Sequence, residues 1–296
     1  MAAAVPLLSR AQDFFCLCKP KVVALMLLTA WAGMHLSTRS FVPLPAFLFG
    51  TIGIALAASA AAVFNHLADR HIDAKMTRTF HRPIASGRIS PKTALYFACL
   101  TATLGLSILS VFVNFLTALL TAITMLGYAA CYTLFLKRAT PQNIVIGGAA
   151  GATPPLLGWT AVTGKVEADA LLLVLIIFTW TPPHFWALAI HRLQDYKNAE
   201  IPMLPVTHGI AYTKLCILLY TFLLFAVTLL PFVTGMSGPL YLTAALLLGI
   251  LFIRYTFKLY WDVSNRFALK TFSFSIVHLL LLFTFLMIDH YYVSSR

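Results

Sequence analysis

The strongest constraint on this chain is a series of long apolar segments that carry almost no charge. A helix that crosses a bilayer needs about 20 such residues. Of the 296 residues, 60% are hydrophobic and 10% are charged, against roughly 25% charged in a typical soluble domain. Unbroken apolar runs fit helices and do not fit the short alternating segments of a membrane β-barrel. The sequence therefore predicts an all-α, polytopic membrane protein and excludes a soluble globular or fibrous one.

The apolar segments predict nine membrane-spanning helices in a single intramembrane domain over residues 1–296. Their ranges are 22–36, 46–67, 93–113, 115–136, 143–162, 168–190, 214–234, 239–257 and 271–291. Asn114 is expected to join the third and fourth helices in a tight hairpin. The polar segments that remain are an N-terminal segment, 1–21, and two cytoplasmic loops at 69–91 and 192–213.

The basic residues predict the orientation of these helices. With the N-terminus inside, 18 of the 21 Lys and Arg residues fall on the inner side, and only Arg39, Lys165 and Arg296 fall outside. Such a bias predicts a cytoplasmic N-terminus and an external C-terminus. It also accounts for the net charge of +12 without a nucleic-acid partner, so the expected surroundings are a lipid bilayer. The short chain shows no organelle presequence, which favours a bacterial inner membrane.

The first polar loop follows three oxygen-bearing side chains, Asn65, Asp69 and Asp73. Their i, i+4, i+8 spacing places them on one face of a helix. Hard cations such as Mg²⁺ prefer oxygen ligands of this kind, completed by waters and substrate phosphates. The basic residues that come next are Lys75, Arg78 and Arg82. Because arginine forks suit phosphate oxygens, the pattern predicts a metal–diphosphate site rather than a salt-bridged helix end.

The second polar loop repeats the combination of an acid with bases. His191 and Asp195 are four residues apart, and Arg192 and Lys197 lie beside them. Prolines interrupt the spans that approach this loop, in the sequences TPP at 153–155 and TPP at 181–183. Proline breaks helical hydrogen bonding, and such breaks inside a membrane tend to line a cavity enclosed by protein.

These motifs resemble a known family. The pattern N-x₃-D-x₃-D-x₄-R-T-x₂-R-P, from Asn65 to Pro83, is similar to the first aspartate motif of the UbiA-type intramembrane prenyltransferases. Four further segments resemble the members of that family that farnesylate haem: YTLFLKRATPQN (132–143), GATPPLLGW (151–159), WTPPHFW (180–186) and DYKNAEIPMLP (195–205). The resemblance covers nearly all nine predicted helices. One departure is that His191 stands where the wider family usually has the first aspartate of its second motif, which leaves only Asp195 acidic there.

The resemblance implies a UbiA-type fold, with the helices enclosing a central cavity, and transfer of a farnesyl group from farnesyl diphosphate to a vinyl group of haem b. Water adds in the same reaction, and the products are haem O and diphosphate. The implied mechanism is Mg²⁺-assisted ionisation to an allylic carbocation, which the vinyl group attacks. A downstream haem-modifying enzyme or a terminal oxidase assembly is the further partner that such a product implies.

The resemblance, together with the residue types, gives three sets of expected site residues. The catalytic and metal-ligating set is Asn65, Asp69, Asp73 and Asp195. The diphosphate-binding set is Lys75, Arg78, Arg82, Lys137, Arg138, Arg192 and Lys197. The set expected to line the haem or prenyl cavity is Tyr128, Tyr132, Trp159, His184, Trp186 and His191.

Two other functions remain open from the sequence. One is a prenyltransferase of the same family that acts on a phenolic or quinone-precursor acceptor, since the first loop serves both reactions. The segments around His184 and Asp195 favour haem. The other is a transporter without enzymatic activity. Transporters tend to place ionisable residues near the bilayer midplane, whereas the acids here lie at the cytoplasmic ends of the predicted helices.

Overall fold

In a computed structural model, the backbone is described for residues 7–77 and 79–294, and the side chains for 10–77, 79–129, 132–133, 135–137 and 139–292. Every regular element within these residues is a helix. The elements are α1 (Leu7–Leu17), α2 (Pro20–Leu36), α3 (Leu44–Asp73), α4 (Pro91–Phe112), α5 (Phe115–Leu126), the π-helix η1 (Gly127–Leu136), α6 (Lys137–Ala139), α7 (Asn143–Gly151), α8 (Pro154–Thr163), α9 (Ala168–His191), α10 (Leu193–Asn198), α11 (Leu204–Thr207), α12 (Gly209–Val233), α13 (Pro239–Trp261) and α14 (Phe267–Ser294).

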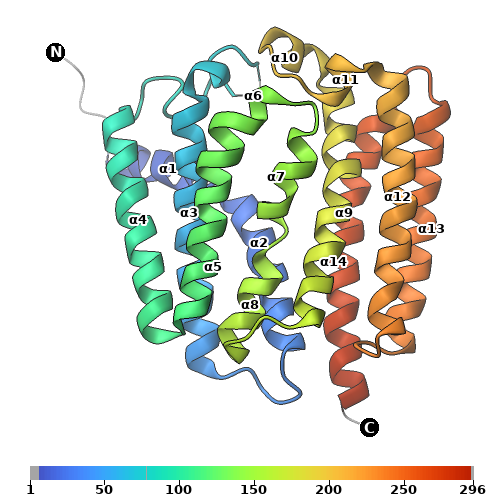
Figure 1. Ribbon diagram of the computed structural model, residues 1–296. Helices are drawn as coiled ribbons and strands as arrows, with labels where there is room; N and C mark the ends of the chain where they lie inside the picture. The colour runs from blue at the N-terminus through green and yellow to red at the C-terminus, as the bar shows by residue number, and fades with distance from the viewer. Residues whose placement is uncertain (1–6, 78, 295–296) are drawn as a thin grey trace.

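The long helices stand side by side in one bundle (Figure 1). Helix α3 packs against α4, and α2 packs against α8. On the other side, α12 lies between α9 and α13, and α14 contacts both α13 and α9. The short helices α6, α10 and α11 cover one end of the bundle, at the top of Figure 1, and α14 runs to the opposite end. Both polar loops of the sequence therefore lie at the same end.

Six of the nine predicted spans are continuous helices in the structure. Helices α3, α4, α9, α12, α13 and α14 are each long and apolar enough to cross a membrane. Helices α1 and α2, which meet at a 47° bend, add a seventh crossing if the bent pair is counted as one span. The other two predicted spans are interrupted, because one changes from α5 into η1 and the other divides into α7 and α8. The nine-helix count is therefore approximate, while the all-helical, multi-pass membrane class is correct.

The local sequence explains where these helices start and break. Asn114 caps α5, because its side-chain oxygen accepts the Thr117 N–H at 2.9 Å, which confirms the predicted hairpin. The side chain of Asn114 also donates to the Thr160 carbonyl at 2.8 Å and so ties the hairpin to α8. Pro154 begins α8 and ends the preceding helix. The prolines at 182–183, in contrast, lie inside α9, which remains continuous; the expected break is absent there.

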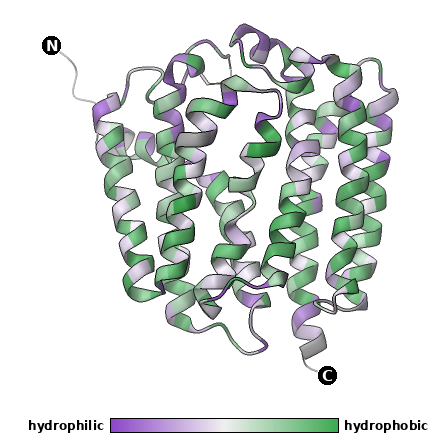
Figure 2. Ribbon diagram, in the orientation of Figure 1, coloured by the Kyte–Doolittle hydropathy of each residue, from purple (hydrophilic) through white to green (hydrophobic). Residues whose placement is uncertain are grey.

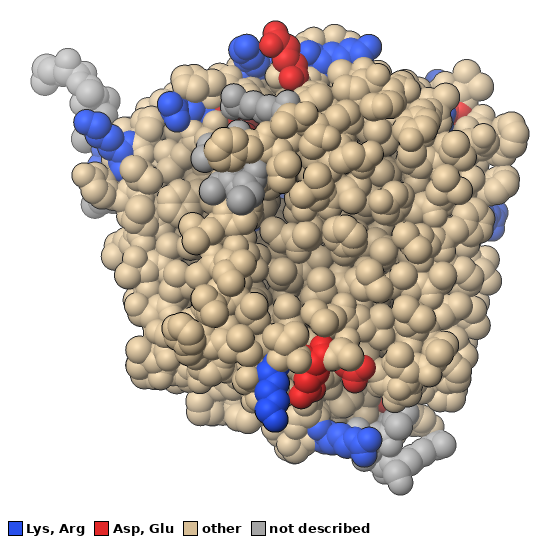
Figure 3. All heavy atoms as spheres, viewed as in Figure 1, with Lys and Arg blue, Asp and Glu red and all other residues tan. Residues whose placement is uncertain are grey.

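The surface of the bundle matches a membrane environment. Apolar residues dominate the middle of the helices, and polar residues gather at the two ends (Figure 2). Charged side chains on the visible face follow the same division, with a broad uncharged band between them (Figure 3). Large apolar side chains such as Phe115, Ile123 and Leu219 are more than half exposed. Exposure of that extent is expected of a surface that contacts lipid.

Two glycines allow α2 and α8 to approach each other very closely. A Cβ atom added at Gly158 would lie 1.9 Å from the Ala30 carbonyl oxygen, and one added at Gly33 would lie 2.0 Å from the Pro155 carbonyl oxygen. Both obstructing atoms belong to the backbone, so neither can turn aside as a side chain would. Small residues at helix contacts in membranes have this function. The contact holds the half-helix α8 against α2, beside the central cavity.

We predict that Gly158→Ala lowers the thermal stability of the detergent-solubilised protein, because the added methyl group must push α8 away from α2. Overpacking of this kind costs about 1–3 kcal/mol. Gly127→Ala is the matched control, since a Cβ there meets no atom within 4 Å and the backbone is helical. The measurement is the melting temperature by size-exclusion chromatography after heating. Equal melting temperatures for the two variants would contradict the close contact.

Candidate active site

A cavity of ≈ 1320 Å³ lies inside the bundle. Ligand sites in proteins usually measure about 300–1,000 Å³, so this cavity has room for more than one small molecule. Its walls come mainly from α1, α2, α3, α5, η1, α7, α8, α9 and α14. One end is polar and carries Asp69, Asp73 and Arg82, whereas the deeper walls are apolar, with Ile54, Leu157 and others. The cavity therefore offers a charged compartment next to a hydrophobic one.

The three oxygen-bearing residues of the first motif line the polar end. Asn65, Asp69 and Asp73 lie on α3 with exposed fractions of 5%, 2% and 4%. They share one face of that helix, as the spacing predicts. Burial of two carboxylates is costly unless partners compensate for lost water. The neighbouring cations supply those partners.

Each acid is matched by a basic side chain from another segment. Arg82 donates to both oxygens of Asp73, at 2.9 and 2.8 Å. Lys137 Nζ lies 2.6 Å from Asp69 Oδ2, and Asn65 Nδ2 donates to the same oxygen at 2.9 Å. The first loop thus folds back over its own helix, and Lys137, the first residue of α6, pairs with α3.

Lys19 is a cavity residue that the sequence analysis treated only as a topology signal. Its Nζ donates to the Asn65 side-chain oxygen, and it lines the same polar end. The backbone of Lys19 has φ 49, a left-handed conformation that is uncommon outside glycine and, in a residue before proline, sterically disfavoured. Strained residues of this kind cluster at functional sites. The sequence feature that could have indicated this role is the Lys19-Pro20 pair, which stands at the start of an apolar helix.

The polar end carries more positive than negative charge. Three cations, Lys19, Lys137 and Arg82, face two carboxylates, Asp69 and Asp73. An anion entering this compartment would meet three hydrogen-bond donors that carry positive charge. The arrangement therefore suits a ligand with several negative charges.

A hydrogen bond joins the second loop to the first. The Thr77 hydroxyl donates to Asp195 Oδ1 at 2.9 Å, and Arg192 Nη1 lies 3.9 Å from Asp195 Oδ2. Asp195 does not itself line the cavity, but its neighbour Tyr196 does. The two loops thus meet over the polar end, as their similar compositions suggest.

The acids have the chemistry required to hold Mg²⁺ with a diphosphate. Asp69 Oδ1 and Asp195 Oδ2 are buried and accept no hydrogen bond from the described residues. Among those residues, no group of three His, Cys, Asp or Glu side chains converges as a metal cage. Mg²⁺ usually takes only one or two carboxylates and completes its shell with waters and substrate phosphates, so the donor set fits that ion. Asn65 and Asp73 currently bind Lys19 and Arg82 through their oxygens.

Aromatic rings cover one wall of the cavity. Tyr128 and Tyr132 stack with centroids 5.5 Å apart, and both line the cavity. They lie on η1, a π-helix of the type that often marks functional positions. A Cβ atom at Gly147 would lie 2.3 Å from the Tyr132 ring. Glycine at that position therefore lets the ring lie flat against α7.

His184 also faces the cavity, from the middle of the bundle. Its ring is sandwiched between Trp180, at 4.1 Å, and Phe272, at 4.5 Å. Ser275 Oγ lies within hydrogen-bond distance of the Phe272 carbonyl and 2.6 Å from His184 Nδ1. When the hydroxyl donates to the carbonyl, Nδ1 donates to the hydroxyl, and the neutral imidazole then keeps a lone pair on Nε2. These contacts fix the orientation of the ring.

Several predicted site residues lie elsewhere. Trp159 donates to Glu167 at 3.0 Å, and Trp186 packs edge-on against Tyr220; both belong to the packed core and not to the cavity wall. His191 is exposed at the end of α9. The basic residues Lys75, Arg192 and Lys197 also do not line the cavity. Arg78 and the side chain of Arg138 lie outside the described residues.

The sequence of this chain is similar to the sequences of known proteins. The profile of the UbiA prenyltransferase family matches residues 26–287. A protoheme IX farnesyltransferase of Legionella pneumophila (strain Paris) is 60% identical over 281 residues, which are 95% of this chain and 96% of that protein.

Solved structures show the same fold at low sequence identity. A digeranylgeranylglyceryl phosphate synthase has a TM-score of 0.80 at 19% identity and covers 96% of this chain and 99% of its own. A UbiA homolog from Archaeoglobus fulgidus, bound to GPP and Mg²⁺, has a TM-score of 0.66 at 18% identity, with 93% and 99% covered.

Proposed function

The chain belongs to the UbiA prenyltransferase family, and we propose that it transfers a farnesyl group from farnesyl diphosphate to a vinyl group of haem b, with addition of water, giving haem O and diphosphate. The observation that carries this function is the division of one cavity into a charged end and an apolar interior. The Legionella relative, a protoheme IX farnesyltransferase, supports the donor and the acceptor. The enzyme is thus a prenyltransferase of the membrane, and its acceptor is haem.

The diphosphate of the donor would lie at the polar end. Lys19, Lys137 and Arg82 can donate to its oxygens and stabilise the charge that grows as the C–O bond breaks. One well-placed donor to developing negative charge contributes about 3–4 kcal/mol. The Asp69–Lys137 and Asp73–Arg82 pairs keep these cations in position before the substrate arrives.

Mg²⁺ is the cofactor that this site would take. Asp69 and Asp73, with Asn65 beside them and Asp195 from the second loop, would hold it together with the diphosphate oxygens. When bound, it would supply further positive charge to the leaving diphosphate. The UbiA homolog from Archaeoglobus fulgidus that binds GPP and Mg²⁺ supports this choice of ion.

Ionisation of the donor leaves an allylic carbocation, which the electron-rich vinyl group of haem attacks. A cation of this kind must be kept from water until the carbon–carbon bond has formed. The stacked rings of Tyr128 and Tyr132 present aromatic faces that attract positive charge. The second carbocation, formed beside the porphyrin ring, is then quenched by water. No protein nucleophile is required for the first bond.

His184 is the residue we assign to the haem. Its Nε2 carries a free lone pair, and imidazole nitrogen is a suitable ligand for iron. The stacked Trp180 and Phe272 rings and the Ser275 hydroxyl fix its orientation. Such supporting contacts around a metal-binding histidine usually matter for affinity. Coordination by His184 would hold the porphyrin in the apolar part of the cavity.

We predict that His184→Gln raises the KM for haem b on the order of 100-fold and leaves the KM for farnesyl diphosphate unchanged. Ser275→Ala should have a smaller effect on haem, about tenfold, because it removes only the support of the ring. The Soret band of bound ferric haem should lose its imidazole signature in His184→Gln. His71→Gln, at an exposed position on α3, is the control. An unchanged haem spectrum in His184→Gln would contradict the assignment.

The protein is an integral membrane protein with several membrane-spanning helices. We further propose a bacterial inner membrane, with a cytoplasmic N-terminus and an external C-terminus. The excess of basic residues at the end that carries both polar loops supports this orientation. It would open the diphosphate compartment towards the cytoplasm, where a water-soluble leaving group can depart. A downstream haem-modifying enzyme or a terminal oxidase assembly would receive the product.

Diphosphate release tests the function and its main alternative together. Purified protein in detergent receives farnesyl diphosphate and Mg²⁺, with haem b in one sample and a phenolic acid in another. We expect release that depends on haem b. Release that depends on the phenolic acid alone would leave the diphosphate site intact and overturn the haem assignment. No release with either acceptor, from protein that remains folded and monodisperse, would contradict prenyl transfer itself.

A further inference from the structure

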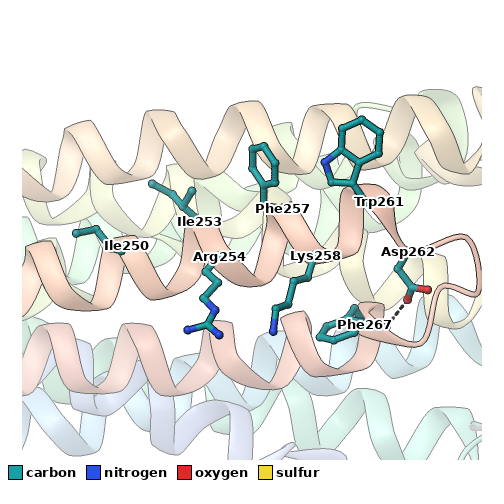
Figure 4. Close-up of a pocket in the computed structure, with 8 residues that line it drawn as sticks. All are labelled: Ile250, Ile253, Arg254, Phe257, Lys258, Trp261, Asp262 and Phe267. Atoms are coloured by element: carbon teal, nitrogen blue, oxygen red, sulfur yellow. Dashed lines mark hydrogen bonds between the residues drawn. The ribbon is translucent and has the colours of Figure 1, made fainter.

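A second hollow lies on the outside of the bundle, along α13 and the start of α14 (Figure 4). Its volume is ≈ 770 Å³. The residues that line it are Ile250, Ile253, Arg254, Phe257, Lys258, Trp261, Asp262 and Phe267. None of them lines the central cavity. We call this hollow the α13–α14 groove; the farnesyl-transfer site makes no use of it.

Two cations lie one helical turn apart in the α13–α14 groove. Arg254 and Lys258 extend from the same side of α13 towards α14 (Figure 4). Both are exposed, and within the described part of the chain neither forms an ion pair with a carboxylate. Lys258 Nζ lies 5.6 Å from the centre of the Phe267 ring, and Lys270 Nζ lies 4.9 Å from it. The groove is therefore both basic and aromatic.

The one acid in the α13–α14 groove is already engaged. Asp262 accepts the backbone N–H groups of Ser264 and Phe267, both at 2.9 Å, and the Ser264 hydroxyl at 2.6 Å. These hydrogen bonds hold the pKa of Asp262 below its usual value. Its role is to cap the turn that leads into α14. The charge of Arg254 and Lys258 is thus left for a ligand from outside the chain.

The positions of Arg254 and Trp261 relative to the membrane indicate that the ligand is a lipid. Arg254 lies seven residues before Trp261, which is about 10 Å along the helix axis. A charged side chain exposed at this depth is costly unless it reaches the interface or meets a partner. Trp261 is 71% exposed, and exposed tryptophan is typical of the headgroup region. Long basic side chains extend towards that region, so both cations can meet a phosphate there.

We propose that the α13–α14 groove binds an anionic phospholipid, with the phosphodiester between Arg254 and Lys258 and the acyl chains along Ile250, Ile253 and Phe257. Basic pockets between membrane helices on the cytoplasmic side recognise such headgroups. Ile250 lies one helical turn deeper than Arg254, and Ile253 and Phe257 extend from the other side of α13, next to the two cations (Figure 4). The groove thus matches the charge and the depth of that ligand.

Trp261 provides a direct probe. The protein is placed in mixed micelles with brominated phosphatidylglycerol or with brominated phosphatidylcholine, and tryptophan fluorescence is followed. We expect quenching at a lower mole fraction of the glycerol lipid. Trp261→Phe should remove the difference between the two lipids, because Trp159, Trp180 and Trp186 are buried and the half-buried Trp31 lies on α2, outside the groove. Equal quenching of the wild-type protein by the two lipids would overturn the proposal.

The charge requirement is tested with a double variant. Arg254→Gln with Lys258→Gln should weaken the apparent affinity for brominated phosphatidylglycerol by roughly 30-fold, given the usual contribution of a basic residue near an anionic surface. Lys92→Gln with Lys165→Gln removes the same charge at exposed positions elsewhere and should keep the preference. Loss of the preference in both double variants, or in neither, would overturn the site. Reversal of quenching by inorganic phosphate would identify a free anion, not a lipid, as the ligand.

Discussion

Replacing Asp69 with asparagine should lower the rate of farnesyl transfer by about 10³-fold. Asp69 is buried at the polar end of the cavity, where Oδ2 pairs with Lys137 and Oδ1 accepts no hydrogen bond from the described residues. The substitution keeps the shape of the side chain and removes its charge. It thereby weakens the proposed Mg²⁺ site and releases Lys137 from its fixed position. A loss of this size corresponds to about 4 kcal/mol of transition-state stabilisation.

The control for this variant is Asp169→Asn, the same chemical change at the opposite end of the bundle, in the first turn of α9. It should retain wild-type activity. The measurement is haem O formation per minute by protein of equal monodispersity, over a range of Mg²⁺ concentrations. Partial recovery of Asp69→Asn at high Mg²⁺ would agree with a ligand role. Full activity of Asp69→Asn at ordinary Mg²⁺ would contradict the site as described.

Replacing Lys19 with methionine should lower kcat/KM for farnesyl diphosphate by about 10²-fold, with little change in the KM for haem b. Lys19 Nζ donates to the Asn65 side-chain oxygen, beside the place proposed for the diphosphate. Methionine fills a similar space but is apolar. The decrease in kcat/KM therefore measures what the hydrogen-bond donor and the charge of Lys19 contribute. Steady-state kinetics with each substrate varied in turn measures the two effects separately.

Lys19→Arg should recover part of the activity, because it restores a cationic donor. Lys92→Met, at an exposed position at the start of α4, is the matched control and should behave as the wild type. A purely structural role of Lys19 would lower the amount of folded protein and leave the kinetic constants of the remainder unchanged. That result would remove Lys19 from the diphosphate site.

The features that the sequence predicted well depend on local spacing. Asn65, Asp69 and Asp73 share a face of α3 because residues four apart in a helix are neighbours. The Asn114 cap is likewise local, since the side chain bonds a backbone group three residues away. The ion pair between Arg82 and Asp73 was not predicted, because the sequence pattern assigned Arg82 to the diphosphate rather than to a salt bridge at the end of the helix.

The features that the sequence did not predict depend on how helices are rotated and bent in the bundle. Lys19 lines the cavity from the bend of 47° between α1 and α2. Trp159 and Trp186 have the same apolar surroundings in the sequence as Trp180, yet only Trp180 lines the cavity. Asp289 is an acid within a predicted span. In the structure it caps α13, since it accepts the Tyr241 N–H at 3.1 Å. Such roles require the neighbouring helix to be known.

The most direct test of the central claim is the mass of the haem product formed in water enriched in ¹⁸O. Purified protein is incubated with farnesyl diphosphate, Mg²⁺ and haem b, and the pigment is separated and weighed by mass spectrometry. We predict a haem heavier by one farnesyl group and one hydroxyl group, whose oxygen is ¹⁸O, and no such product from Asp69→Asn. Diphosphate release without any farnesylated haem would contradict the claim that haem is the acceptor.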